Sequence, residues 1–452
     1  MSIAPVREHV LPDYMKASDL LKVAPRTMAV DGGKVTLGGV DLLDIAKRFG
    51  TALYVYDEDH IRHQLASYRD EFKTCYPQSN VVYAAKAFCC VAMDKVVAEE
   101  GCYIDVASGG ELAIAQAAGF PMEHVIAQGN NKSELEIEQC IDAGIGCFVV
   151  DTHEEMERIS AYAHSKGKTQ RIIIRVCPGI EADTHAYIQT ANEDSKFGFN
   201  IRNGAAEQAL SFALTLPGID MAGFHCHIGS QIFELTSYVE AINTMFAFMN
   251  DMRQAHDFVA HIFDMGGGLG IPYTIYDRPS TIAQFASVAT GAIHANCSEY
   301  DYPYPEILTE PGRSIVANAG ITLYTVGSVK TVPGICTYVA VDGGMTDNIR
   351  TALYGSKYEA FVVNNADKPR DVICDIVGKH CESGDVVVKN SPLQACTAGD
   401  IICVLGTGAY CNEMASNYNK QVRPGVVFVK DGEIREVVRR ETYEDLLRRD
   451  VY

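Results

Sequence analysis

The feature that most constrains the fold is an alternation of short apolar runs with helix-like segments. Eight runs have the length and composition of buried strands: Val81–Ala84, Tyr103–Val106, His124–Ala127, Cys147–Val150, Arg171–Cys177, Met221–His227, His261–Asp264 and Glu306–Glu310. The segments between them include Gly110–Ala118, Lys132–Ala143, His153–Ser165, Ala205–Leu214 and Ser237–Ala255. Eight such units predict a (β/α)8 barrel, in which functional residues follow the C-terminal ends of the strands. An open, doubly wound sheet is the alternative for the same pattern.

The sequence on either side of this alternation has a different character. From about Ala319, short β-rich runs are interrupted by Gly, Asp and Asn, which predicts an all-β domain over residues 319–452. Residues 1–56 contain further strand-like runs, Lys34–Leu37 and Leu53–Tyr56, and are expected to add strands to this domain. The barrel is expected over residues 57–318, with Asp57 capping its first helix.

Composition narrows the possible partners and surroundings. The chain has 58 acidic and 38 basic side chains, a formal charge of −20, which disfavours binding to nucleic acid. No apolar run approaches the roughly 20 residues that span a bilayer, and the N-terminal residues lack the pattern of a signal or transit peptide. The 15 cysteines form no C-x-x-C pair, so we expect small buried hydrophobic residues in a reducing compartment, the cytoplasm.

Lys86 follows the first of the eight strand-like runs, in the sequence VVYAAKAF. One interpretation is a lysine that ends a strand and extends into solvent. The other is a lysine whose partly desolvated amine forms a Schiff base with an aldehyde such as that of pyridoxal phosphate. Only the residues at the other strand ends distinguish the two.

Two later strand ends carry histidines and glycines. His225 and His227 are two residues apart, which would put both on one face of a strand. An H-x-H metal half-site, a core histidine and an imidazole stacked on a cofactor ring are the alternatives; we expect no metal, because no convincing carboxylate and histidine set recurs on neighbouring strands. The glycines of DMGGGLG, Asp264–Gly270, would let backbone N–H groups approach a phosphate.

The last strand-like run ends in TEPGRS, where Glu310 and Arg313 are three residues apart. These two side chains are either a surface ion pair or part of a cofactor site. In a pyridoxal phosphate site a carboxylate keeps the pyridine nitrogen protonated, and an arginine binds an anion. The cofactor site is favoured, because the lysine, the histidines, the glycine turn and the Glu–Arg pair follow successive strands of one barrel.

Longer motifs extend this pattern over nearly the whole chain. They are YAAKAF around Lys86, DVASGGEL at Asp105–Leu112, QGNNKS at Gln128–Ser133, DSKFGF at Asp194–Phe199, HCHIGSQ, GGGLG, EPGR, VDGGMTDNIRTALYG at Val341–Gly355, CESGD at Cys381–Asp385 and GAYCNEMASNYN at Gly408–Asn419. With these motifs the chain resembles the fold-type III pyridoxal phosphate-dependent decarboxylases of the ornithine, diaminopimelate and arginine group, most closely those acting on diaminopimelate.

The resemblance implies a role for individual residues. Lys86 would bind pyridoxal 5′-phosphate covalently and Cys381 would donate a proton. The other implied cofactor contacts are Asp105, His227, Ser230, Gly267, Gly268, Glu310, Pro311, Gly312, Arg313 and Tyr410. The implied substrate contacts are Arg313, Arg350, Tyr354, Glu382 and Tyr410.

The resemblance also implies an activity and an assembly. The implied reaction is decarboxylation of meso-2,6-diaminopimelate to L-lysine, the last step of lysine biosynthesis, in a homodimer whose sites each receive CESGD from the partner. An arginine for the distal carboxylate and an acid for the distal ammonium suit this substrate. Decarboxylation of ornithine, arginine or lysine is the alternative, and a racemase or a cofactor-binding protein is a third possibility. Cys381 as an inert thiol also stays open.

Two segments depart from the family pattern or resist interpretation. After Cys411 the chain has Asn412 and Glu413, where an aromatic and a small residue are expected. An acid so close to Tyr410 would either alter substrate preference or point into solvent. The stretch Ile180–Ser195 resembles the family's active-site loop.

Overall fold

The computed structural model describes residues 16–180 and 196–451, and these divide into two compact units. One unit comprises the described residues of 62–271 and 278–314, and the other comprises residues 16–61, 272–277 and 315–451. The loop that resembles an active-site loop, residues 181–195, lies outside the described residues.

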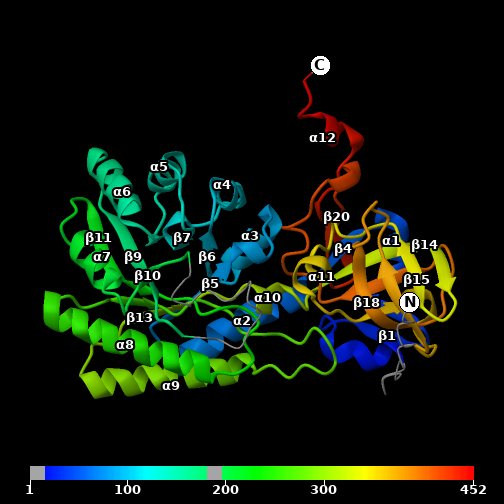
Figure 1. Ribbon diagram of the computed structural model, residues 1–452, viewed down its shortest axis with the longest axis horizontal. Coiled ribbons are helices and arrows are strands. Elements are labelled where there is room, and N and C mark those ends of the chain that lie inside the picture. The colour runs from blue at the N-terminus through cyan, green and yellow to red at the C-terminus, as the bar shows by residue number, and fades with distance from the viewer. Residues whose placement is uncertain (1–15, 181–195, 452) are drawn as a thin grey trace, which may run out of the picture. The chain divides into compact units, whose positions relative to one another are not determined.

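The first unit is a closed barrel of eight parallel strands (Figure 1). The strands are β5 (Ser79–Ala84), β6 (Tyr103–Val106), β7 (Val125–Ala127), β8 (Cys147–Val150), β9 (Gln170–Cys177), β11 (Ile219–His225), β12 (Ile262–Asp264) and β13 (Glu306–Thr309). Pairing of β13 with β5 and of β8 with β9 closes the ring, which confirms the barrel and excludes the open sheet. A short strand, β10 (Phe199–Asn200), pairs with β9.

Helices cover the outside of these strands (Figure 1). They are α2 (Glu58–Cys75), α3 (Val91–Glu99), α4 (Gly109–Ala118), α5 (Glu134–Ala143), α6 (His153–Ser165), α7 (Ala205–Ala213), α8 (Thr236–His256) and α9 (Ile282–Tyr300). Polar caps start several of them: Ser133 and Thr281 form capping boxes, and Thr152 accepts from the Glu155 backbone N–H. Asp57 Oδ1 accepts from His60 N at 3.1 Å, which confirms the expected cap of the first barrel helix.

The barrel interior is filled by side chains from alternate positions of its strands. The cluster consists of Val82, Ile126, Cys147, Val149, Ile173, Ala222, Ile262 and Leu308. All are buried, so the barrel is a packed core, and only the strand ends and the loops after them are open to ligands.

The second unit is a β-domain built on a nine-stranded sheet. Its strands are β4 (Leu53–Asp57), β14 (Gly320–Val332), β15 (Cys336–Val341), β16 (Ala360–Val362), β17 (Val372–Val377), β18 (Val386–Leu393), β19 (Ile401–Leu405), β20 (Gly425–Lys430) and β21 (Glu433–Val438). The N-terminal strand β4 lies between β14, to which it is antiparallel, and β20, to which it is parallel. The expected contribution of N-terminal strands to this sheet is therefore confirmed.

Smaller elements complete the β-domain. They are the 3-10 helix η1 (Ala17–Val23), strands β1 (Ala29–Asp31), β2 (Lys34–Leu37) and β3 (Val40–Asp41), and helices α1 (Leu42–Phe49), α11 (Arg350–Tyr354) and α12 (Tyr443–Leu447). The three short strands form a separate antiparallel sheet. This sheet and α1 share one apolar core with β4, β14, β19 and β20. Helix α10 (Arg313–Val316) crosses the boundary between the units.

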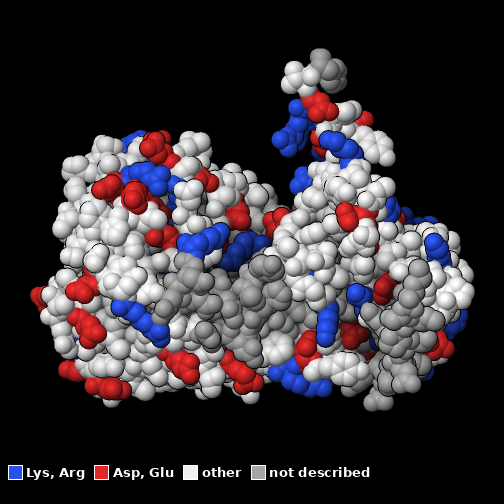
Figure 2. All heavy atoms as spheres, viewed as in Figure 1, with Lys and Arg blue, Asp and Glu red and all other residues white. Residues whose placement is uncertain are grey.

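The structure shows the state of the cysteines and the distribution of charge on one face. All 15 cysteines are free thiols; most are buried, and Cys381 is exposed. Figure 2 shows acidic and basic side chains interspersed on the face in view, with basic ones along the C-terminal arm that carries α12. Arg423, Arg439, Arg448 and Arg449 line a cleft of about 740 Å³ there. Among the described residues, no helix has the length and apolarity needed to cross a membrane.

Candidate active site

Lys86 lies directly beyond the end of β5, in a 3-10 turn formed by Ala85–Ala87. Its side chain is exposed, whereas Ala85 and Ala87 on either side are completely buried. Asp105, near the end of the neighbouring strand β6, accepts a hydrogen bond from Ala85 N at 3.1 Å. The buried Asp105 thus fixes the backbone of the turn from which the Lys86 amine projects.

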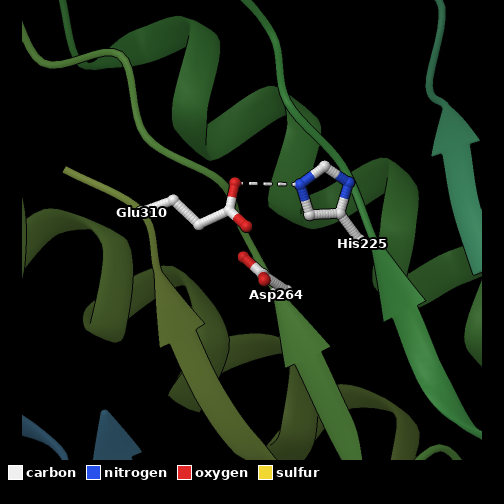
Figure 3. Close-up of side chains that lie close together, drawn as sticks. All are labelled: His225, Asp264 and Glu310. Atoms are coloured by element: carbon white, nitrogen blue, oxygen red, sulfur yellow. Dashed lines mark hydrogen bonds and ion pairs between the residues drawn. The ribbon is translucent and has the colours of Figure 1, made fainter. Parts of the chain in front are cut away.

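Glu310 follows β13 and is held by two side chains from other strand ends. Its Oε1 accepts from Gln128 Nε2 at 2.5 Å, and its Oε2 is 3.1 Å from His225 Nε2 (Figure 3). The side chain is 8% exposed. Hydrogen bonds to both oxygens orient the carboxylate and favour its charged form.

Asp264, at the end of β12, lies beside this pair (Figure 3). Its Oδ1 accepts from Gly266 N at 2.9 Å, and its Oδ2 is buried without a hydrogen-bond partner among the described residues. Ligand atoms of His225, Asp264 and Glu310 all lie within 4.8 Å of one another. The expectation that no carboxylate and histidine set recurs on neighbouring strands was therefore wrong: β11, β12 and β13 bring these three together.

Burial separates the protonation states of the three carboxyl groups. Burial alone would raise the pKa of Glu310, but the charge and hydrogen bond of His225 and the charge of Lys86 hold it below its ordinary value. Burial and the negative charge of Glu310 raise the pKa of Asp264 and of Asp105 well above the ordinary value. Of the three carboxyl groups, Glu310 is therefore the one whose charged form the site favours, and burial beside it disfavours the charged forms of Asp264 and Asp105.

His227 lies two residues beyond the end of β11, so the expectation that both histidines belong to the strand was wrong. His225 is the last strand residue, and the chain has left the sheet before His227. His227 Nδ1 accepts from Gly267 N at 3.4 Å. Desolvation by the surrounding protein and the charge of Lys86 hold the pKa of His227 well below its ordinary value, so its ring is neutral at pH 7.

The glycine turn after β12 has no space for side chains. A Cβ on Gly267 would lie 1.9 Å from the backbone oxygen of Glu310, and one on Gly268 would lie 2.2 Å from that of Gly229. Gly268 also has a φ of +115°, which disfavours any residue with a side chain. The turn therefore presents bare backbone beside Glu310, as a cradle for a phosphate requires.

The EPGR segment packs against the turn that carries Lys86. Pro311 O accepts from Ala84 N at 3.1 Å, and a Cβ on Gly312 would lie 2.9 Å from that of Ala84. Arg313 is 6% exposed and donates from Nε and Nη2 to Ser230 Oγ, at 3.2 and 2.9 Å. The two predicted anion contacts, Ser230 and Arg313, are thus brought together.

Three of the predicted substrate residues form a cluster in the β-domain. The Arg350 guanidinium lies 5.0 Å from the centre of the Tyr354 ring and 5.1 Å from that of the Tyr410 ring. Arg350 is 6% exposed, and its Nε has no hydrogen-bond partner among the described residues. The stacked arginine keeps a donor available for an anion.

Cys381 and Glu382 lie on the loop between β17 and β18, and both are exposed. The motif was expected to form an exposed loop, and this is confirmed. Near Tyr410, the side chains of Asn412 and Glu413 hydrogen-bond to each other at 2.9 Å, and Glu413 is exposed. The acid therefore points to solvent in the described chain.

Sequence reasoning assigned no role to Gln128 or Asp264 and did not connect His225 to Glu310. The signal for Gln128 was its place directly after β7, in the motif QGNNKS. Four residues later, Lys132 donates to Gly129 O at 2.8 Å and to Glu155 at 2.6 Å in a buried ion pair. The loop after β7 is therefore fixed by a charge pair behind the site.

The site fits pyridoxal phosphate by its donors and its space. A projecting lysine amine suits the aldehyde, and a carboxylate held in its charged form suits a protonated ring nitrogen. The turn at Gly267 and Gly268 has no side chains and no room for them, so a group as small as a phosphate would meet only its backbone. The charge of Lys86 acts on Asp105, His227 and Glu310, which places all four groups within one site.

Comparisons with known proteins agree with this geometry. The sequence model for the pyridoxal-dependent decarboxylase family, pyridoxal binding domain, matches residues 58–317. The chain is 46% identical over 419 residues to the diaminopimelate decarboxylase of Bacillus subtilis (strain 168), covering 93% of this chain and 95% of that one.

Solved structures give the same result. Diaminopimelate decarboxylase from M. jannaschii is similar with a TM-score of 0.88 at 31% identity, covering 94% of this chain and 98% of that one. The Helicobacter pylori diaminopimelate decarboxylase complexed with L-lysine has a TM-score of 0.82 at 31% identity, with coverage of 90% and 98%.

Proposed function

Because the chain belongs to the pyridoxal-dependent decarboxylases, and among them to the diaminopimelate decarboxylases, we propose that it converts meso-2,6-diaminopimelate to L-lysine and carbon dioxide. The observation that carries the proposal is the full-length similarity to enzymes of that activity, at 46% identity over 93% of the chain. Pyridoxal 5′-phosphate is the cofactor of this family, and the reaction completes lysine biosynthesis.

The cofactor supplies an aldehyde that condenses with amines and a pyridinium ring that accepts the electrons of the broken C–CO2 bond. Lys86 would hold the cofactor by its aldehyde, through the side-chain amine. Glu310, oriented by Gln128 and His225, holds the proton on the ring nitrogen. The neutral ring of His227 would pack against the cofactor ring, and Asp105 fixes the backbone of the Lys86 turn through its hydrogen bond from Ala85 N.

The phosphate contacts proposed here are Ser230, Gly267, Gly268, Tyr410 and the start of EPGR, which comprises Pro311, Gly312 and Arg313. Support comes from the bare backbone of the glycine turn and from the arginine–serine pair. Arg313 donates from Nε and Nη2 to Ser230 Oγ, which orients its guanidinium.

The far end of diaminopimelate carries both a carboxylate and an ammonium, and we assign one residue to each. Arg350, held between Tyr354 and Tyr410, binds the distal carboxylate, and Glu382 binds the distal ammonium. A substrate whose distal group is only cationic would place a positive charge against Arg350, so ornithine and arginine are disfavoured. Cys381 donates the proton that replaces the carboxylate.

The proposal includes a homodimer in the cytoplasm. The exposure of Cys381 and Glu382 supports a site completed by a second copy, because a proton donor must work away from bulk water. Fifteen free thiols support a reducing compartment.

The test is incubation of the purified protein and pyridoxal phosphate with meso-diaminopimelate, ornithine, arginine and lysine. We expect carbon dioxide release and L-lysine formation with meso-diaminopimelate alone. Turnover of ornithine or arginine without turnover of diaminopimelate would refute the proposed substrate.

The role of Lys86 has its own readout. Lys86→Ala should lose the visible absorbance that a covalently bound cofactor produces, while keeping the secondary structure of the wild type. Persistence of that absorbance in the variant would show that another group binds the aldehyde.

A further inference from the structure

The loop that carries Cys381 and Glu382 is tied down by the last residue of its own motif, Asp385. This carboxylate is buried, at 4% exposure, and accepts three hydrogen bonds. They come from Met345 N at 2.6 Å, from His380 N at 2.8 Å and from His380 Nδ1 at 2.8 Å. Asp385 thus closes a turn whose first and last residues, His380 and Asp385, are hydrogen-bonded, while the four residues between them, Cys381 and Glu382 included, are exposed.

Two glycines leave the space that this carboxylate occupies. A Cβ on Gly344 would lie 2.5 Å from an Asp385 carboxylate oxygen, and one on Gly378 would lie 2.2 Å away. No residue with a side chain fits at either position without displacing Asp385. The Asp385 carboxylate therefore packs between the backbones of Gly344 and Gly378.

The other nitrogen of His380 connects the loop to a second segment. His380 Nε2 lies 2.9 Å from Thr346 Oγ1, which lies 3.2 Å from Asp347 Oδ1, and Tyr324 donates to the other Asp347 oxygen at 2.5 Å. A neutral His380 donates to Asp385 and accepts from Thr346. A charged His380 donates to both, and the threonine hydroxyl then donates to Asp347. Either arrangement satisfies the buried ring.

Two further contacts restrain the same loop. Cys381 N donates to Asn419 Oδ1 at 2.9 Å. The His380 ring stacks on that of Tyr418, with centres 6.1 Å apart and planes 17° apart. The backbone of Cys381 is thus fixed while its thiol stays exposed.

We propose that His380 and Asp385 are positioning residues that hold the Cys381–Glu382 turn in register with the segment leading to Arg350. Thr346, which receives the His380 ring, is four residues before Arg350, the first residue of α11. In the proposed dimer, the network of one copy therefore sets the proton donor and the acid that enter one site and the arginine of the other site, and by symmetry both sites depend on it. Its effect on catalysis rests on the proposed function of those residues; its effect on the turn does not.

The two nitrogens of His380 can be tested separately. An asparagine amide reaches the place of Nδ1, so His380→Asn keeps the bond to Asp385; a glutamine amide reaches that of Nε2, so His380→Gln keeps the bond to Thr346 only. Asp385→Asn and Thr346→Val remove single partners at nearly constant volume. Glu359→Gln is the matched control, because it breaks another buried ion pair of this domain, with Arg370 at 2.9 Å.

The first readout is the alkylation rate of Cys381 by iodoacetamide in the cofactor-free protein, measured by peptide mass spectrometry. We expect a rate at least about fivefold higher in His380→Gln and Asp385→Asn, because the turn loosens, and a rate within about twofold of wild type in His380→Asn. Glu359→Gln should lower the melting temperature and leave the rate unchanged. Equal rates in all variants, or an equal rise in the control, would overturn the proposal.

The second readout is steady-state turnover. In His380→Gln and Asp385→Asn, kcat should fall and KM should rise, with kcat/KM lower by at least about tenfold, because donor and substrate contact move together. His380→Asn should recover most of the loss. If wild type failed to decarboxylate diaminopimelate, the proposed function would fall and the alkylation result would stand; unchanged kcat/KM in folded variants of an active enzyme would refute the positioning role.

Discussion

At the scale of single residues, the site is organised around the Glu310 carboxylate, which Gln128 and His225 orient. Lys86 and Glu310 could be predicted, because each follows a strand-like run and belongs to a recognisable motif. Gln128 could not, because an uncharged amide after a strand has many uses and only the fold shows that it reaches Glu310 at 2.5 Å. The pairing of Asp264 with Glu310 escaped for the same reason, since their strands are far apart in the sequence.

Replacing Gln128 by leucine should weaken cofactor binding. Glu310 would remain buried without the hydrogen bond that Gln128 donates to its Oε1, a loss of about 1–3 kcal/mol in the free energy of unfolding. Urea unfolding and titration with pyridoxal phosphate measure the two effects. Gln170→Leu is the control: Gln170 is equally buried at the start of β9, so its loss should affect stability alone. Wild-type affinity in Gln128→Leu would contradict the assigned role.

Replacing Asp347 by asparagine should change how stability depends on pH. Burial raises the pKa of Asp347 from 3.8 to about 6, so between these values the folded protein holds a proton that the unfolded chain has lost. The wild type therefore loses stability as pH rises through this window. Relative to wild type, the variant should gain about 1.4 kcal/mol between pH 5 and pH 7.5.

The measurement for Asp347→Asn is the free energy of unfolding in urea at several pH values. The matched control is Asp251→Asn at an exposed position of α8, which makes the same change in net charge. A stability difference between Asp347→Asn and wild type that stayed constant across this range would contradict the predicted shift.

At the scale of elements, periodicity located the barrel strands to within a few residues. Each is short, buried and rich in β-branched residues, so the pattern alone is informative. The local pattern is weaker in β18, which contains Asn390 and Pro392, and in β21, which is exposed or half-buried along its length. Partners in the sheet, rather than local sequence, make these segments strands.

Substitution by alanine should have opposite effects at Gly267, in the turn after β12, and at Gly291, within helix α9. Gly267→Ala places a methyl group 1.9 Å from a backbone oxygen, so the turn must move and cofactor affinity should fall by at least about tenfold. Gly291→Ala, within α9 and with nothing within 4 Å, should raise the free energy of unfolding by about 0.5–1 kcal/mol. Cofactor titration and urea unfolding of both variants test this; equal cofactor affinity in the two would contradict the cradle.

At the scale of the whole molecule, the residues proposed to act in catalysis and in substrate binding are divided between the two units. The barrel carries Lys86 and Glu310, whereas the β-domain carries Arg350 and the exposed Cys381. The barrel and β-domain could be predicted from the sequence, because apolar periodicity marks each. The assembly could not, because nothing in a single sequence records which surfaces of two copies meet.

A shared site predicts that two inactive variants restore each other. Lys86→Ala and Cys381→Ala should each lose most activity alone. If every site takes Lys86 from one copy and Cys381 from the other, random mixing after dissociation yields intact sites at about a quarter of the positions. Recovery of about that fraction of wild-type activity is expected. No recovery, with mixed dimers shown by mass spectrometry, would place both residues in the same copy.

The position of β4 has a consequence for the order in which the protein forms on the ribosome. All five residues of β4 are buried, yet its neighbours β14 and β20 are translated only after the whole barrel sequence. Until Gly425–Lys430 emerges, this apolar strand has an unpaired edge, which is the kind of surface that aggregates and that chaperones bind. A message truncated before β20 would therefore yield a barrel attached to an incomplete, aggregation-prone sheet. Synthesis of β20 is the event that covers this edge of β4.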